Sequence, residues 1–168
     1  GGTSLLQFKL ELLKKVVGIT RIVVSTDCDT SADMALKEGA EVQWRNEYYA
    51  GSDVTNDQHW LHIAQTTPGD IVFLAQVTSP LLRVSSMQAA LKAFLSFGTH
   101  DSINSVSAEK KFLWKDTKPI NYNMDATPKS QNLPEIVSLN FAITIISKQT
   151  MMERKNVIGY KPSFFELS

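Results

Sequence analysis

The stretch Asp70–Arg83 reads DIVFLAQVTSPLLR, and its character changes at a single residue. Ile71–Ala75 is an unbroken apolar run, which is typical of a short strand buried on both faces of a sheet. Neutral hydrogen-bonding side chains follow it directly, on Gln76, Thr78 and Ser79. The stretch therefore predicts a buried strand that ends in an uncharged polar turn.

Outward from this stretch, helical patterns alternate with short apolar strands. The spacing of apolar residues predicts helices over residues 4–17, 31–38, 55–66 and 85–97, and strands over residues 21–25, 41–44 and 71–75. Ser4 with Gln7 fits a capping box, and Thr55 and Ser85 are expected to cap their helices. The alternation predicts a three-layer α/β/α fold with a mostly parallel sheet.

The pattern of apolar and polar residues changes after residue 101. Residues 102–108 alternate like a half-exposed strand, and residues 135–147 form a long apolar run that predicts another strand. Between them, residues 115–134 are polar and rich in proline, so we expect a loop or an excursion from the body. A short helix over residues 148–156 and a final strand over residues 162–167 complete the prediction, and residues 46–54 are expected to form a polar loop.

Composition bounds the class of protein. The 168 residues fit one domain, and a hydrophobic content of 43% is enough to build a core. Lysine plus arginine equal aspartate plus glutamate at 17 each, so bulk charge does not favour nucleic acid or an anionic membrane as a partner. The N-terminal apolar stretch is broken by charges, among them Lys9, and no run reaches membrane-spanning length. With one cysteine, the chain is expected in the cytoplasm.

The expected architecture predicts where a ligand binds. In open parallel sheets, ligands bind outside the carboxyl ends of the strands. Two predicted strands end in polar loops there, one after Ser25 and one after Ala75. The amide of Gln76 and the hydroxyls of Thr78 and Ser79 suit nucleobase edges, ribose hydroxyls or phosphate oxygens. The alternative is that the two hydroxyls only cap the turn before the proline that follows them.

Other polar residues are weaker candidates. His59 and His62 lie three apart on a predicted helix and are either a metal pair or a packed pair, the packed pair being favoured by the lack of a third ligand. Cys28 follows a strand end, where we expect a small buried thiol rather than a nucleophile. Asp27 and Asp29 suit a metal or hydroxyl groups, and Asp29 also fits a helix cap. Neither G-x-x-x-x-G-K-[ST] nor G-x-G-x-x-G occurs.

Five short motifs fall in an order that is hard to obtain by chance. They are STD at residues 25–27, GAEV at 39–42, QVTSPL at 76–81, SQNLP at 130–134, and Asn140 before AITI. Their order resembles the acylneuraminate cytidylyltransferase family, the CMP-sugar-acid synthetases, whose corresponding motifs are STDD, GAEV, LQPTSPLR, RRQDLP and ENGAIY. The resemblance covers nearly the whole chain.

The resemblance implies a fold and an activity. The fold is a Rossmann-like nucleotide-diphospho-sugar transferase architecture, with residues 1–168 as a single nucleotidyltransferase core. The activity is transfer of CMP from CTP to a 2-keto, sialic-acid-like sugar acid, with release of pyrophosphate and with Mg²⁺ as cofactor. Nucleotidyl transfer of this kind needs positioning and charge neutralisation more than a protein nucleophile, and no catalytic residue is assigned.

The resemblance also implies binding residues and a partner. The expected nucleotide or sugar contacts are Gln76, Thr78, Ser79, Asp27, Lys111, Lys129, Gln131 and Asn140. Residues around 110–135 correspond to the segment that reaches across a homodimer in the family, so we expect a dimerisation excursion there.

The chain departs from the family pattern at several of these motifs. Val77 replaces a proline, Arg83 stands one place after the family's arginine, and KSQN replaces RRQD, which removes guanidinium groups that lysine cannot imitate. Phe141 and Thr144 replace a glycine and a tyrosine. These changes concern the sugar substrate more than the nucleotide fold.

The family's phosphate-cradling loop and its D-x-D magnesium motif are also expected to lie outside these 168 residues. The chain is then either the core of a cytidylyltransferase, a non-catalytic nucleotide-binding or dimerisation remnant, or a nucleotidyltransferase for another nucleotide sugar.

Overall fold

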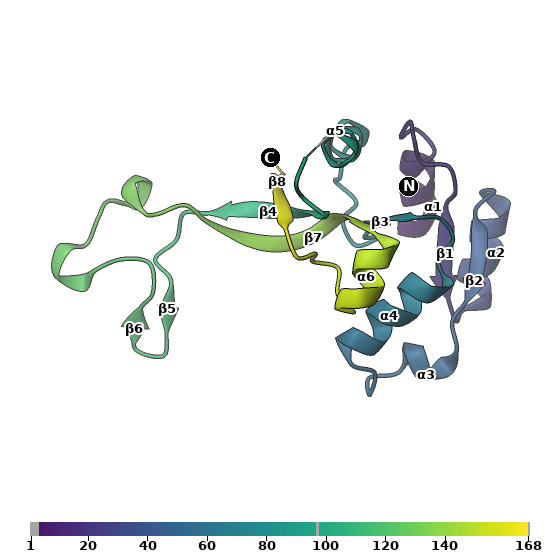
Figure 1. The fold of residues 1–168 in the computed structure, drawn as a ribbon, viewed down its shortest axis with the longest axis horizontal. Helices are drawn as coiled ribbons and strands as arrows, with labels where there is room; N and C mark the ends of the chain where they lie inside the picture. Colours follow the sequence, from purple (N-terminus) through teal and green to yellow (C-terminus); the bar gives the residue numbers. More distant parts are fainter. Residues whose placement is uncertain (1–3, 97, 168) are drawn as a thin grey trace.

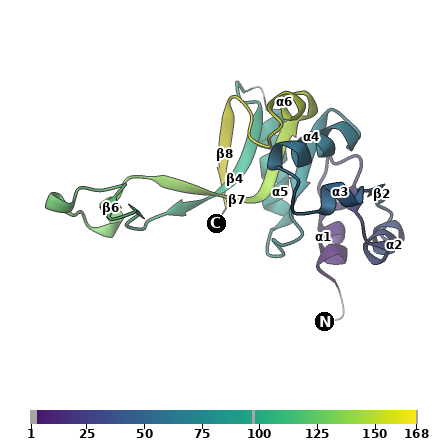
Figure 2. The ribbon, with the colours of Figure 1, turned by 90° about the horizontal axis from the view of Figure 1, so that it is seen from below.

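The structure of the chain is a computed structural model, and it describes residues 4–96 and 98–167. A body of helices surrounds the central strands, and the segment between β4 and β7 projects from this body as a long arm (Figure 1). The turned view in Figure 2 shows the same arm extending away from the helices.

The strands of the body form two sheets. The smaller pairs β1 (Val23–Thr26) with β2 (Glu41–Trp44) in parallel. The larger has the order β3-β7-β4-β8, with bounds Ile71–Ala75, Ile136–Ser147, Ser102–Glu109 and Pro162–Glu166. Strand β7 runs antiparallel to both neighbours, whereas β4 and β8 are parallel. The predicted α/β class is confirmed, and the direction of β7 makes the larger sheet mixed.

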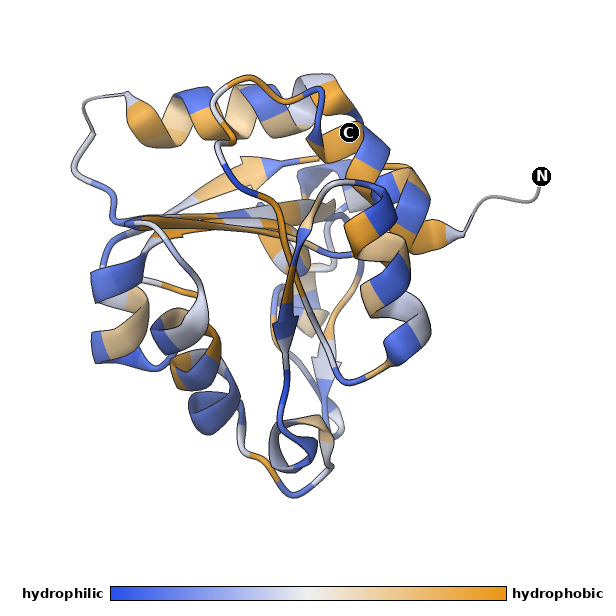
Figure 3. Cartoon of the chain, turned by 90° about the vertical axis from the view of Figure 1, so that its right-hand side faces the viewer, coloured by the Kyte–Doolittle hydropathy of each residue, from blue (hydrophilic) through white to orange (hydrophobic). Residues whose placement is uncertain are grey.

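Helices cover both faces of the larger sheet. The helices are α1 (Leu5–Leu13), α2 (Asp29–Lys37), α3 (Glu47–Ala50), α4 (Asn56–Thr66), α5 (Val84–Leu95) and α6 (Lys148–Arg154). Successive residues of β7 point to opposite faces, so Ile145 packs in the cluster beneath α5 while Ile146 packs with α4 and α6. A third cluster joins Leu10 of α1 to Ala35 of α2. Figure 3 shows the apolar strand residues between these helices.

Most predicted elements are confirmed, and the differences lie at their ends. Thr55 caps α4 and forms a complete capping box with Gln58. Ser4 caps α1 by accepting from the Gln7 amide, which is half of the expected box, and the Gln7 side-chain nitrogen donates to Glu38. The expected Ser85 cap is wrong, because α5 begins one residue earlier.

Three further predictions, on the loop at 46–54, on Asp29 and on the exposure of β4, are corrected by the structure. The expected loop at 46–54 contains α3, whose amide at Tyr48 donates to the side chain of Asn46. Asp29 is the first residue of α2 rather than its cap. Strand β4 is not half-exposed: Ser102–Val106 is buried because both faces are covered, with Ile103 packed in the cluster beneath α5 and the Asn104 side chain donating to the Val157 carbonyl on the other face. Phe97, the last residue of a predicted helix, lies outside the described residues.

The arm contains little regular structure. It holds a short hairpin of β5 (Trp114–Lys115) and β6 (Lys118–Pro119), followed by two 3-10 turns at Met124–Ala126 and Ser130–Asn132. The predicted excursion from the body is therefore present. Within residues 4–96 and 98–167, no helix has the length and apolar character needed to cross a membrane.

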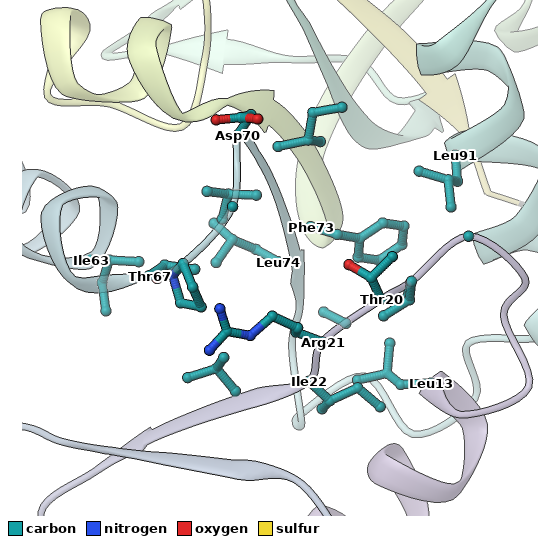
Figure 4. Close-up of a pocket in the computed structure, with 18 of the residues that line it drawn as sticks. Leu13, Thr20, Arg21, Ile22, Ile63, Thr67, Asp70, Phe73, Leu74 and Leu91 are labelled. Atoms are coloured by element: carbon teal, nitrogen blue, oxygen red, sulfur yellow. The ribbon is translucent and has the colours of Figure 1, made fainter.

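The two sheets do not join. Within the described part of the chain, β1 pairs only with β2 and β3 pairs only with β7. A slot of about 580 Å³ lies between β1 and β3 (Figure 4). The single sheet that the alternation of elements predicts is thus divided at this slot.

Candidate nucleotide site

The polar turn after β3 is two consecutive β-turns that share Ser79. The amide of Ser79 donates to the carbonyl of Gln76 at 3.2 Å, and the amide of Leu82 donates to the carbonyl of Ser79 at 3.3 Å. The ammonium of Lys9, on α1, donates to the same Ser79 carbonyl at 2.8 Å. We call residues Gln76–Leu82 the double turn. Its shape is fixed by two of its own amide hydrogen bonds and by the ammonium of Lys9.

Lys9 is an unusual support for a turn. Its side chain is only 1% exposed, and burial lowers the pKa of its ammonium. Within the described residues no acidic side chain contributes to this shift. No local pattern indicates this residue's role, because a lysine within an amphipathic helix is typical of a solvated face.

A bulge in β7 lies beside the double turn. The β4–β7 register shifts between Asn104 and Val106, and the extra residues of β7 include Asn140. The Asn140 side chain accepts hydrogen bonds from Ser105 Oγ at 2.6 Å and from the Ala142 amide at 3.2 Å. Its amide group donates to Ser107 Oγ at 2.9 Å. Neighbouring hydroxyls therefore hold Asn140 in one orientation.

The double turn and the bulge line one hollow of about 400 Å³. Thr78, Ser79 and Asn140 contribute hydroxyl and amide groups, and Arg83 and Ser86 lie at the start of α5 on the same hollow. The combination of one guanidinium with neutral donors and acceptors suits a ligand that is both anionic and rich in hydroxyls. Bulges are common next to binding sites, where they redirect a side chain.

Three predicted contacts therefore come together, and two residues were missed. Thr78, Ser79 and Asn140 share the hollow. Gln76 is exposed at the start of the double turn and does not line the hollow. In the sequence, Arg83 was noted only because it stands one place after the arginine of the family motif. No sequence pattern indicated that Ser86 belongs to the site.

Asp27 lies at the end of β1, on the smaller sheet. Its carboxylate is paired with Arg45 at 2.9 Å, and this hydrogen bond lowers the pKa of Asp27. The adjacent Cys28 is exposed, so the expected buried thiol is wrong. Hydrogen bonds from Ser31 and Thr30 at the start of α2 lower the pKa of the Cys28 thiol.

The remaining predicted contacts lie on the arm or at its base. Lys111 is exposed and pairs with Glu109 at 2.9 Å. Lys129 and Gln131 are exposed at the second 3-10 turn and do not line the hollow. The structure of one chain therefore does not bring the arm residues to Asn140.

The two histidines of α4 are packed. His62 stacks on Tyr49 with ring centroids 3.8 Å apart, and His59 meets Trp60 edge-on. Burial, followed by the charges of Arg45 and His62, lowers the pKa of His59. Among residues 4–96 and 98–167, no three His, Cys, Asp or Glu side chains lie close enough to hold a metal ion. The residues present do not fit a magnesium site.

Comparison with known proteins supports the fold alone. No protein-family model and no curated protein matches the chain. The fold is similar to that of CMP:2-keto-3-deoxy-manno-octonic acid synthetase complexed with CTP, with a TM-score of 0.68 and 10% identity over 97% of this chain and 78% of that one. It is also similar to 4-diphosphocytidyl-2C-methyl-D-erythritol synthase from Anaerococcus prevotii, with a TM-score of 0.72 and 12% identity over 99% and 78% of the two chains. A cytidylyltransferase from Leptospira borgpetersenii gives a TM-score of 0.56 and 19% identity over 91% and 53%.

Proposed function

We propose that the chain is the core of a nucleotidyltransferase that moves CMP from CTP to an acceptor hydroxyl and releases pyrophosphate. One observation carries this proposal: Thr78, Ser79, Arg83 and Asn140 line a single hollow at the carboxyl end of β3. That is where ligands bind in open α/β sheets. The similar folds of proteins named as cytidylyltransferases and as a CTP complex favour cytidine nucleotides over others.

The residues of the hollow act by holding the ligand. Arg83 supplies a planar fork of donors that matches a phosphate or carboxylate, and the Thr78 and Ser79 hydroxyls suit a ribose or sugar hydroxyl. Asn140 is held by Ser105 and Ser107, so its orientation is set before a ligand arrives. Transfer of CMP to an acceptor hydroxyl depends on in-line positioning of that hydroxyl against the α-phosphate, which such a rigid wall supports without a protein nucleophile.

The acceptor in this proposal is a 2-keto sugar acid. Its carboxylate and hydroxyls would use the same chemistry that the hollow offers, and the motif order of the sequence supports the choice. The proposal includes a homodimer, in which the arm brings Lys111, Lys129 and Gln131 to the partner's site, and a cytoplasmic location. Magnesium would neutralise phosphate charge, but no step is assigned to it because the described residues do not fit the ion.

The test uses protein expressed from the complete coding sequence that contains these residues. With CTP, magnesium and a panel of 2-keto sugar acids, we expect release of pyrophosphate, and UTP and GTP should be poorer donors. Replacing Arg83 with alanine removes a charged hydrogen-bond donor worth about 1.5–3 kcal/mol, so kcat/KM should fall by at least about tenfold.

The matched control is Arg154→Ala. Arg154 is an exposed arginine on α6 that stacks on Tyr160 and lies outside the hollow, so kcat/KM should stay at the wild-type value. Absence of pyrophosphate with every nucleotide and acceptor would favour the non-catalytic alternative, a nucleotide-binding or dimerisation module. Activity with an unchanged kcat/KM in Arg83→Ala would move the site away from this hollow.

A further inference from the structure

Lys9 places a buried positive charge directly behind the wall of the hollow. Its side chain is 1% exposed, and its ammonium donates to the Ser79 carbonyl at 2.8 Å. Ser79 itself lines the hollow, whereas Lys9 does not. A single residue of the double turn therefore contacts the ammonium on one side and faces the proposed ligand on the other.

The charge of this ammonium is not balanced by an acidic side chain. Within residues 4–96 and 98–167, no salt bridge includes Lys9. Burial lowers the pKa of Lys9, which is the direction expected when no carboxylate stabilises the charged form. The positive charge is thus available to an anion on the other side of the double turn.

The shape of the double turn does not by itself require a lysine at this position. The Ser79 carbonyl also accepts from the Leu82 amide at 3.3 Å, so the second turn has a hydrogen bond of its own. A glutamine side chain would donate to the same carbonyl without bringing a charge into the interior. Burial of an unpaired ammonium opposes folding, and local features that oppose folding are expected at functional sites.

The hollow is a place where additional positive charge is useful. Arg83 is the one cationic side chain among the described residues that line it, and none of those residues is acidic. A nucleoside triphosphate carries several negative charges, which a single guanidinium balances only in part. Fixed cations that surround a phosphoryl group are a recurrent means of holding it for transfer.

We propose that Lys9 is a positioning residue of the nucleotide site, whose buried charge attracts the phosphates of the nucleotide through the double turn. The ammonium does not touch the ligand. It fixes the Ser79 main chain and adds a second positive charge to that of Arg83. Because packing holds it away from solvent, salt screens this charge less than it screens an exposed lysine.

This inference rests on the proposed function, because it requires that the hollow holds a nucleotide. The test measures dissociation constants by NMR titration, without divalent ions, in protein expressed from the complete coding sequence that contains these residues. Lys9→Gln keeps a hydrogen-bond donor and removes the charge, whereas Lys9→Met removes both. The two probes are CTP, which is anionic, and cytidine, which is neutral.

We expect both variants to bind CTP at least about threefold more weakly than wild type, because a nearby charge is lost. Their affinity for cytidine should stay within about twofold of wild type, because a neutral ligand does not respond to that charge. The Tm of both variants should stay at or above the wild-type value, since the ammonium is buried without an acidic partner. Weaker binding is then not a result of unfolding.

Lys15→Met is the matched control. It also removes one lysine, but from the turn after α1, where the side chain is exposed. Solvent and salt screen this charge, so the affinity for CTP should stay within about twofold of wild type. A loss of affinity equal to that of Lys9→Gln would show that only the net charge of the protein matters, and it would contradict the inference.

The remaining outcomes separate this inference from the proposed function. Wild-type affinity for CTP in Lys9→Gln would make Lys9 a donor that only shapes the turn, which overturns the inference and leaves the proposed function intact. An equal loss for CTP and cytidine would overturn it as well, since a deformed turn weakens both ligands. A wild-type protein that binds neither ligand would contradict the proposed function itself, and the inference with it.

Discussion

The ammonium of Lys9 shows how a single residue takes on a role that its sequence context conceals. In the sequence it stands among the charges that break an apolar stretch. In the structure it is buried and holds the Ser79 carbonyl, at the point that both halves of the double turn share. Its neighbours in α1 pack in the cores on either side. A buried cation without an acidic partner is costly, so its removal has a measurable signature.

We expect Lys9→Met to leave the free energy of unfolding within about 1 kcal/mol of wild type near pH 7, or to raise it. The folded-state pKa of Lys9 is lowered by burial, whereas the unfolded value is about 10.4. Between these two values the unfolded state binds more protons, so wild-type stability rises with pH while the variant lacks this contribution. Any advantage of Lys9→Met in urea unfolding should therefore shrink as the pH approaches about 10.

Lys15→Met serves as the control, because Lys15 is exposed in the turn after α1. Comparing the two variants separates the effect of burying the ammonium from the loss of one lysine side chain. A difference between Lys9→Met and wild type that stays constant from neutral to alkaline pH would show that the ammonium is not buried.

At the scale of the element, the bulge in β7 places residues of a core strand in the wall of the hollow. It contains Phe141 at a φ of 52°, in the left-handed region that bulky residues rarely adopt. The family that the sequence resembles has glycine at this position. Asn140 and Ala142 flank it and line the hollow, so the strained residue belongs to the segment that sets the wall of the site.

We expect Phe141→Gly to be more stable than Phe141→Ala by about 1 kcal/mol in urea unfolding. Both variants remove the half-exposed ring, and only glycine relieves the left-handed backbone. Comparing the two variants with one another isolates the backbone effect from the lost side chain. Equal stabilities would mean that the bulge relaxes to an ordinary strand conformation in solution.

At the scale of the whole molecule, the arm exposes apolar surface far from the core. Tyr122 packs edge-on with Phe112 and with Trp114, while Trp114 is 48% exposed and Ile120 is 59% exposed. Exposed apolar patches of this kind mark interaction surfaces. Together with the proposed role of the arm in the partner's site, they favour a dimer built by the arm.

We expect a dimer in sedimentation experiments, and a shift toward monomer in the double variant Trp114→Glu with Ile120→Glu. The charges would be buried without partners at the interface, which opposes association. Leu36→Glu is the control, because Leu36 is 60% exposed on α2 and lies away from the arm. A monomeric wild-type chain, or a double variant that remains dimeric, would argue against the arm as the interface.

Some residues of the candidate site could be predicted from their neighbours in the sequence, and others could not because they reach the site only through the fold. Thr78 and Ser79 were predicted because they follow an apolar strand directly, and the sequence order of motifs pointed to Asn140. Arg83 and Ser86 were missed as members of the site because the start of α5 reaches the hollow only through the fold. The orientation of Asn140 depends on Ser105 and Ser107 of β4, more than 30 residues away in the chain.

The sequence by itself determined the elements and their order. Ile71–Ala75 and Glu41–Trp44 were predicted to the residue, and Thr55 caps its helix as expected, because each depends on neighbours a few positions away. Only the tertiary structure decided the antiparallel course of β7, its bulge, the burial of Lys9 and the slot between β1 and β3. These features arise where distant strands and helices meet, and no local spacing of apolar residues records which edges meet or which remain unpaired.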